Sequence, residues 1–255
     1  MEKQKNELYN HTSYKKINII ISVIVSLFSI QYLAFISFFK VNFPYSSDVP
    51  DIVFFTYDFL KLGQINLLDP VSGHFFVFPR LISFVNLYFN SFDVNNLFYL
   101  QWVVISITIF MMYLILKQTD KKLLWTLIPI SAFLYCPLAS SNYFIPAMLA
   151  WQLPTLSITA IIYFLNKKTN PKNISFSISL AIFSTLSTVI GIIGWIPGLI
   201  INQKKKWFIF WIFSMIIFGI FYISIIPNGE NELHPELLIS YEGYAFIATF
   251  LSTPF

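Results

Sequence analysis

The most constraining feature of this chain is its series of long apolar segments that contain no charged side chain. A helix needs about 20 apolar residues to cross the roughly 30 Å hydrocarbon layer of a membrane, and residues 17–39 meet this requirement. We expect further membrane segments at 97–116, 123–139, 145–165, 174–201 and 207–226, and the start of another at 244–255. The chain is 56% hydrophobic and only 11% charged, whereas soluble domains carry roughly 25% charged residues. The sequence predicts an all-α, polytopic transmembrane helix bundle of about seven membrane segments.

Residues 174–201 are too long for one comfortable span and short for two. Gly191, Gly194 and Pro197 lie in this segment, and such helix breakers are tolerated at membrane depth where the backbone is buried in protein or lines a cavity. The segment therefore either crosses once or forms a hairpin of two short helices around the glycines. We favour the broken hairpin because it places the following Lys204, Lys205 and Lys206 on the same side as the other lysine-rich loops.

The lysine distribution predicts which side of the membrane each loop faces. With the hairpin, all basic residues except Lys40, Lys61 and Arg80 face the cytoplasm, together with the N-terminus. Most acidic residues then lie on the opposite face. The positive net charge of +4 is explained by this topology and by anionic lipid, and it does not indicate nucleic-acid binding. We expect a multi-pass cell-membrane protein.

This topology defines the domain organisation. Residues 1–16 form a cytoplasmic tail, residues 17–255 a single transmembrane domain, and residues 40–96 its long outer loop. The first span lacks a small-residue cleavage site and is typical of a retained anchor rather than a signal peptide. Because the last residues resemble the start of another span, we expect the chain to be the N-terminal portion of a longer protein.

The outer loop begins with a predicted amphipathic helix. Asp48 precedes Val49-Pro50-Asp51 as an N-cap with proline in the first turn, and the helix would end at Gly63 and lie along the membrane surface. Asp48 and Asp51 are explained either as helix caps or as functional carboxylates.

The stretch GHFFVFPR (73–80) places a histidine, a proline and an arginine between apolar segments. Proline favours the first turn of a helix, so we expect a helix from Arg80 to about Phe89. An arginine is not favoured near a helix N-terminus, and we expect Arg80 to have an anionic partner. The alternatives are an Arg80 that snorkels to lipid headgroups and a His74 that is an ordinary loop residue.

Other residue types exclude several kinds of site. The single Cys136 permits no internal disulfide, and the three histidines are far apart in sequence. No glycine-rich phosphate loop or internal repeat is present. We interpret the tryptophans mainly as anchors at the membrane interface: Trp102, Trp125, Trp151, Trp195, Trp207 and Trp211.

The order of these features resembles the polytopic membrane glycosyltransferases of the GT-C type and the uncharacterised membrane proteins related to them. In that superfamily the first outer loop opens with an acidic pair and later carries a His-Arg-x-x-x-Pro-Arg-like stretch; the counterparts are Asp48 and Asp51, then His74, Pro79 and Arg80. The sequence departs from the pattern at Phe75, where the family has arginine, and in the spacing of the acids. Similar downstream elements are GIIGWIPG (191–198) and NYFIPAMLAWQLP (142–154).

The resemblance implies transfer of a sugar from a polyprenyl-phosphate carrier on the non-cytoplasmic face. It assigns Asp51, with Asp48 second, as the base that deprotonates or holds the acceptor hydroxyl, and His74 as an assisting group. Arg80 would hold the lipid phosphate, a task that suits its bidentate guanidinium. Glu230 and His234 would line the same cavity. The implied partners are membrane lipids and the polyprenyl-phosphate-linked sugar; no cofactor is certain, and the use of a divalent metal stays open.

Two other functions stay open from the sequence. The broken 174–201 segment is also typical of transporters and lipid flippases, whose sites are often built from discontinuous helices, although the spans contain almost no ionisable residue. The missing arginine at Phe75 and the end of the chain at Phe255 are compatible with a non-catalytic or truncated subunit that has a membrane-protein partner.

Overall fold

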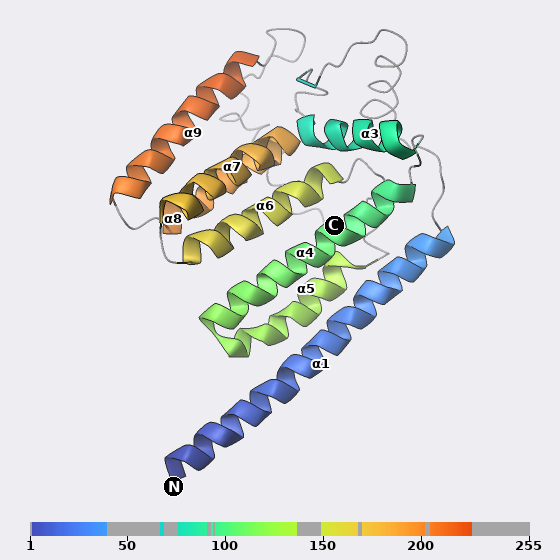
Figure 1. Cartoon of the computed structure of the whole chain (residues 1–255), viewed down its shortest axis with the longest axis vertical. Helices are drawn as coiled ribbons and strands as arrows, with labels where there is room; N and C mark the ends of the chain where they lie inside the picture. Colours follow the sequence, from blue (N-terminus) through green and yellow to red (C-terminus); the bar gives the residue numbers. More distant parts are fainter. Residues whose placement is uncertain are drawn as a thin grey trace, which may run out of the picture.

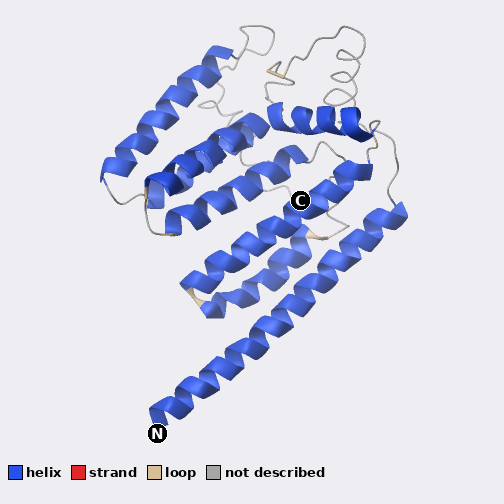
Figure 2. Ribbon diagram, in the orientation of Figure 1, coloured by secondary structure: helices blue, strands red, loops and turns tan. Residues whose placement is uncertain are grey.

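The structure is a computed structural model, and it describes residues 2–39, 67–68, 76–90, 93, 95–136, 149–167, 170–201 and 205–225. Within these ranges the secondary structure is helical and includes no strand (Figure 2). The elements are α1 (Glu2–Phe39), α3 (Val77–Asn90), α4 (Asn95–Thr119), η2 (Lys121–Thr126), α5 (Leu127–Leu134), α6 (Leu149–Asn166), α7 (Pro171–Ser187), η5 (Val189–Trp195), α8 (Ile196–Ile201) and α9 (Lys205–Ile225). The predicted all-α class is confirmed for this part of the chain.

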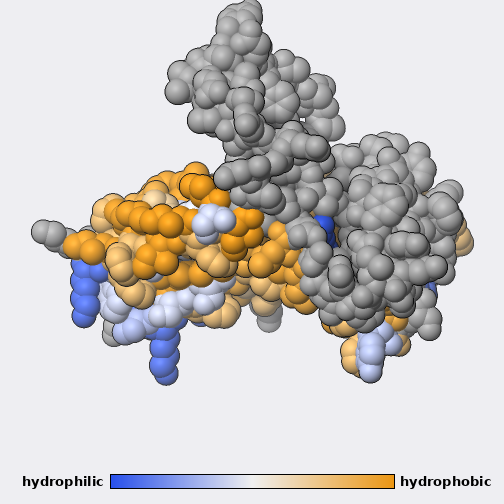
Figure 3. All heavy atoms as spheres, turned by 90° about the horizontal axis from the view of Figure 1, so that it is seen from above, coloured by the Kyte–Doolittle hydropathy of each residue, from blue (hydrophilic) through white to orange (hydrophobic). Residues whose placement is uncertain are grey.

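Four helices are long and apolar enough to cross a membrane. They are Lys16–Phe38 in α1, Asn95–Thr119 (α4), Leu149–Asn166 (α6) and Lys206–Ile225 in α9. Large apolar side chains remain exposed on their outer faces, among them Ile30 on α1, Phe110 on α4 and Ile220 on α9, and Figure 3 shows a broad hydrophobic patch on the described surface. These features support the interpretation as a membrane protein.

Two of the other predicted segments are built from shorter helices. The third segment, predicted at 123–139, contains an apolar helix over Lys122–Leu134, which at 1.5 Å per residue is about 20 Å long and too short for a typical bilayer core. The predicted segment at 174–201 contains α7, η5 and α8. The predicted surface helix after Asp48 and the predicted segment 244–255 lie outside the described residues.

The long helices lie side by side, and α3 lies across one end of the bundle (Figure 1). We call this the α3 end. From the α3 end the chain runs away along α4 and again along α6. It runs toward the α3 end along α7 and again along α9. Lys117 lies in the last turn of α4, Lys167 follows α6 and Lys206 lies in the first turn of α9. These described lysines therefore lie at the opposite end of the bundle.

Helices α1, α4 and α5 form one side of the bundle. Their contact contains the buried residues Tyr32, Ile36, Phe98, Ile105, Ile109 and Tyr135. Two hydrogen bonds join side chains from different segments: Trp102 Nε1 donates to Ser29 Oγ at 2.9 Å, and Ser106 Oγ lies 2.7 Å from the Tyr135 hydroxyl. Such bonds contribute to helix association in a membrane, where no water competes for the donor.

The chain reverses at the end of α7. Thr188 has an extended backbone (φ −168°, ψ 161°), and η5 then packs back against the last turns of α7. A Cβ on Gly191 would overlap the Ser184 carbonyl oxygen, and one on Gly194 would lie 3.2 Å from the Ser184 side chain. The break itself lies at Thr188, and the predicted breaker glycines permit close packing after it.

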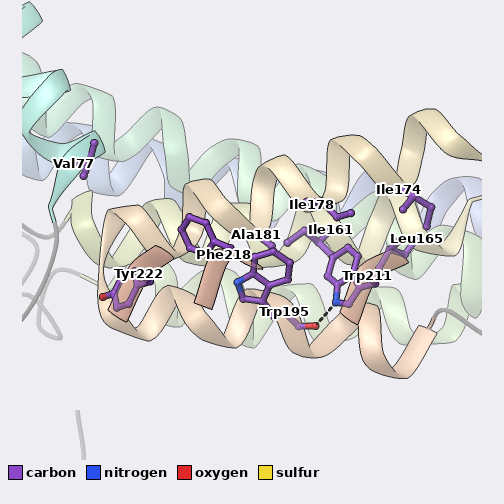
Figure 4. Packing of buried hydrophobic residues seen from close by; sticks show 10 residues of the cluster. All are labelled: Val77, Ile161, Leu165, Ile174, Ile178, Ala181, Trp195, Trp211, Phe218 and Tyr222. Atoms are coloured by element: carbon purple, nitrogen blue, oxygen red, sulfur yellow. Dashed lines mark hydrogen bonds between the residues drawn. The ribbon is translucent and has the colours of Figure 1, made fainter. Parts of the chain in front are cut away.

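The largest buried cluster among the described residues joins α3, α6, α7, η5 and α9, and Figure 4 shows its ten residues. Trp211 is fully buried, and its Nε1 donates to the Trp195 carbonyl oxygen at 3.0 Å. The two indole rings make an edge contact at 5.5 Å between centroids. The interpretation of Trp195 and Trp211 as interface anchors was therefore wrong, because Gly198 leaves room for the Trp211 ring inside the bundle.

Candidate functional site

Helix α3 buries three polar residues and leaves three large apolar residues exposed. Arg80, Ser83 and Asn86 are spaced three residues apart and are all buried, so they form one stripe of the helix. The opposite face exposes Val85, Tyr88 and Phe89. A helix on a protein surface in water has the reverse arrangement, so the outer face of α3 suits contact with lipid. The inner stripe consequently faces the protein.

Arg80 lies in the first turns of α3, close to where the sequence predicted it. The helix begins at Val77, three residues earlier than expected, and the Arg80 amide donates to the Phe76 carbonyl at 2.9 Å. The side chain is only 5% exposed, and Nη1 donates a long bond of 3.4 Å to the Leu67 carbonyl oxygen. Burying a guanidinium is costly unless it is paired and hydrogen-bonded, so the buried Arg80 is a candidate for function.

The far end of the stripe joins the turn between α3 and α4. Asn86 Nδ2 donates to the Asp93 carbonyl at 2.9 Å, and Asn96 Nδ2 donates to Asn86 Oδ1 at 3.4 Å. The Asp93 carboxylate accepts from the backbone and side-chain amides of Asn95 at 3.0 and 2.7 Å. These bonds hold the end of α3 against the first turn of α4.

Two buried amides lie below α3 within the bundle. Gln101 of α4 is fully buried and Gln152 of α6 is 9% exposed. Both lie near the cluster that joins Leu97 to Leu149 and Leu153, at the α3 end of their helices. Neither the nitrogen nor the oxygen of the Gln152 amide has a hydrogen-bond partner in the structure. A buried amide of this kind is costly, and such groups call for a specific explanation.

The end of α7 brings hydroxyl groups to the same region. The Phe78 ring of α3 packs on the Phe183 ring of α7 with centroids 4.0 Å apart, which places the last turn of α7 below α3. Ser184 and Thr188 follow and are fully buried, and neither hydroxyl has a hydrogen-bond partner in the structure. The α3 end thus contains the Arg80 cation together with amides and hydroxyls, which are the kinds of group that bind an anion or hydrogen-bond a polar ligand.

Arg80 is the one sequence-predicted site residue that the described ranges contain. Asp48, Asp51, His74, Glu230 and His234 lie outside them, so the structure does not describe how these residues lie relative to Arg80. Within the described ranges there is also no group of three His, Cys, Asp or Glu side chains that could hold a metal ion.

Most of the residues that share the α3 end with Arg80 were not predicted from the sequence. The i, i+3, i+6 spacing of Arg80, Ser83 and Asn86 was a usable signal for an inward stripe. The amides Gln101 and Gln152 stand in otherwise apolar spans, and a polar residue in such a span usually faces the bundle interior.

Comparisons with protein-family models, with curated proteins and with solved structures found no match to this chain.

Proposed function

We propose that the chain is a membrane glycosyltransferase-like protein that takes a sugar from a polyprenyl-phosphate carrier on the non-cytoplasmic face. The observation that carries the proposal is the buried Arg80 on the inner stripe of α3. A helix with a lipid-facing apolar surface and an inward arginine suits a substrate that has both a hydrocarbon tail and a phosphate. Arginine recognises a phosphate with two parallel N–H···O bonds, which lysine cannot reproduce.

In this proposal the chain has about seven membrane segments and a cytoplasmic N-terminus, and the α3 end faces outward. The lysines at the opposite end of the bundle support this orientation. Asp51, with Asp48 second, would deprotonate the acceptor hydroxyl, His74 would assist, and Glu230 and His234 would complete the cavity. Arg80 would stabilise the phosphate that departs when the bond to the sugar breaks.

Binding of a polyprenyl phosphate to the purified protein tests the role of Arg80. The Arg80→Gln variant should weaken binding by about 10- to 150-fold, which corresponds to loss of one charge-assisted hydrogen-bonded contact of about 1.5–3 kcal/mol. Binding of the uncharged polyprenol should be unchanged. A matched control is Lys117→Gln, which removes an equal charge from the last turn of α4, at the end of the bundle away from Arg80. Equal affinity of wild type and Arg80→Gln for the phosphate would contradict the assignment.

Sidedness is tested by labelling single cysteines in a Cys136→Ser background. Positions 51, 74 and 232 should react from outside only, and positions 119, 170 and 203 from inside only. If positions 51 and 74 react from the cytoplasm, the proposed site faces the wrong compartment. In cells, loss of activity in Asp51→Asn and Arg80→Ala, read as altered surface glycans, should match the effect of deleting the protein.

The buried Gln152 and the hydroxyls at the end of α7 favour a second candidate, a transporter or lipid flippase. Polar groups beside a broken helix are a common arrangement at transport sites. Movement of a lipid-linked sugar across a proteoliposome membrane without sugar transfer would support this candidate over the first.

A further inference from the structure

A pocket of about 360 Å³ lies between α3, α4 and α7, within the size range of small-molecule sites. The side chains of its wall are mostly apolar or aromatic, and they include Phe78, Ile82 and Val85 of α3, Leu97 and Leu100 of α4, and Phe183 of α7. We propose that this pocket binds a hydrocarbon chain of a membrane phospholipid. The inference goes beyond the proposed function and does not depend on it.

The polar groups of the pocket argue against a polar ligand. Asn86 and Asn96 contribute amides to the wall, but they are bonded to each other at 3.4 Å, and Asn86 also donates to the Asp93 carbonyl at 2.9 Å. The remaining wall offers an entering molecule mainly dispersion contacts, which an apolar cavity loses when it stays empty. An aliphatic chain fits this chemistry.

The surroundings of the pocket indicate where its ligand comes from. Val85 belongs to the wall and is 51% exposed, so the pocket opens on the outer side of α3. The surface beside this opening carries the exposed apolar residues Tyr88 and Phe89 of α3 and Val103 and Ile107 of α4. Helix α4 is long and apolar enough to span a membrane, so an opening flanked by its apolar surface suits a ligand from the lipid. Acyl chains are the aliphatic groups that a membrane contains in greatest amount.

Photocrosslinking tests the proposal with the full chain in phosphatidylcholine vesicles. The probe is a phosphatidylcholine with a diazirine at the end of one acyl chain, and the crosslinked peptides are mapped by mass spectrometry. We expect crosslinks concentrated in residues 78–100. Labelling spread over the exposed helices, such as the outer face of α9, without enrichment in 78–100 would overturn the proposal.

Variants that fill the pocket make the test specific. Leu100→Trp and Ile82→Trp should each abolish the crosslinks in 78–100, whereas Ile107→Trp, an equally large change outside the pocket wall on α4, should leave them intact. Retained crosslinks in a folded filling variant would overturn the proposal. If both filling variants fail to fold, the peptide map of the wild type decides by itself.

Competition separates a phospholipid chain from a polyprenyl chain. At a fixed amount of probe, added polyprenyl phosphate should reduce the crosslinks no more than an equal amount of additional unlabelled phosphatidylcholine does. Displacement by polyprenyl phosphate alone would overturn the assignment to a phospholipid. The Arg80→Gln variant should retain the acyl-chain crosslinks even if it loses polyprenyl-phosphate binding, so failure of one proposal is distinguishable from failure of the other.

Discussion

Replacing Gly191 with alanine should destabilise the packing of η5 on α7 by about 2–3 kcal/mol. The added methyl group would overlap the Ser184 carbonyl oxygen and would lie 2.7 Å from the Thr185 amide nitrogen. These are backbone atoms, which cannot rotate away as a side chain can. Either η5 moves outward or the last turn of α7 opens. Overpacking costs typically about 1–3 kcal/mol, and a backbone obstacle places this variant at the upper end.

A gain in the unfolded state offsets part of this cost. Alanine loses less conformational entropy on folding than glycine, which is worth roughly 0.5–1 kcal/mol. Gly219 of α9 isolates this contribution, because a Cβ there meets nothing within 4 Å. Gly219→Ala should therefore be neutral or slightly stabilising. Gly194→Ala should lie between the two, since its new methyl group would meet a side chain at 3.2 Å.

Thermal unfolding of the purified protein in one detergent measures the series. A change of 1 kcal/mol shifts the midpoint by about 2–4 °C for a chain of 150–250 residues. The net cost of Gly191→Ala, about 1–2.5 kcal/mol after the gain from alanine, should therefore lower Tm by roughly 2–10 °C. Fluorescence-detected gel filtration after heating gives an independent reading. A Gly191→Ala protein as stable as Gly219→Ala would refute the close packing of η5 on α7.

Two further substitutions test other contacts. Trp211→Phe should cost about 1–3 kcal/mol because it leaves the buried Trp195 carbonyl without its donor; thermal unfolding should show no comparable loss for the more exposed Trp207→Phe. Asn170→Ala should cost about 1 kcal/mol because the Asn170 side chain caps α7 by accepting from the Asn173 amide at 2.8 Å. Asn170→Asp keeps the acceptor and should unfold at the wild-type midpoint, and equal losses in both variants would contradict the cap.

The membrane helices were the part of the fold that the sequence could predict well. Residues 17–39 and 97–116 are apolar on all sides, so length and composition identify them without knowledge of their neighbours. The segment 123–139 was harder, because its composition is apolar but its helix ends at Leu134. Apolar composition does not reveal where a helix ends when tertiary contacts decide its boundary.

The candidate site was predicted in part. The charge of Arg80 and its position after a proline identified it as a notable residue, but its burial depends on contacts that α3 makes with α4, α6 and α7. Gln152 gave only a partial signal: a glutamine in an apolar span indicates that the side chain faces the bundle interior, but it does not reveal which neighbour the side chain faces. Trp211 was misinterpreted for a related reason: tryptophan at a predicted span end is usually interfacial, and the space that Gly198 leaves for it is a tertiary feature.

The inward stripe of α3 has a consequence for membrane insertion. A short helix that carries an arginine and an asparagine is not stable in lipid by itself, because its polar face must meet protein. The helices that cover this face, α4, α6 and α7, all follow α3 in the chain. We therefore expect α3 to remain at the membrane surface during synthesis and to pack against the bundle only after residues up to 187 have been inserted. The order of translation and the order of assembly consequently differ for this helix.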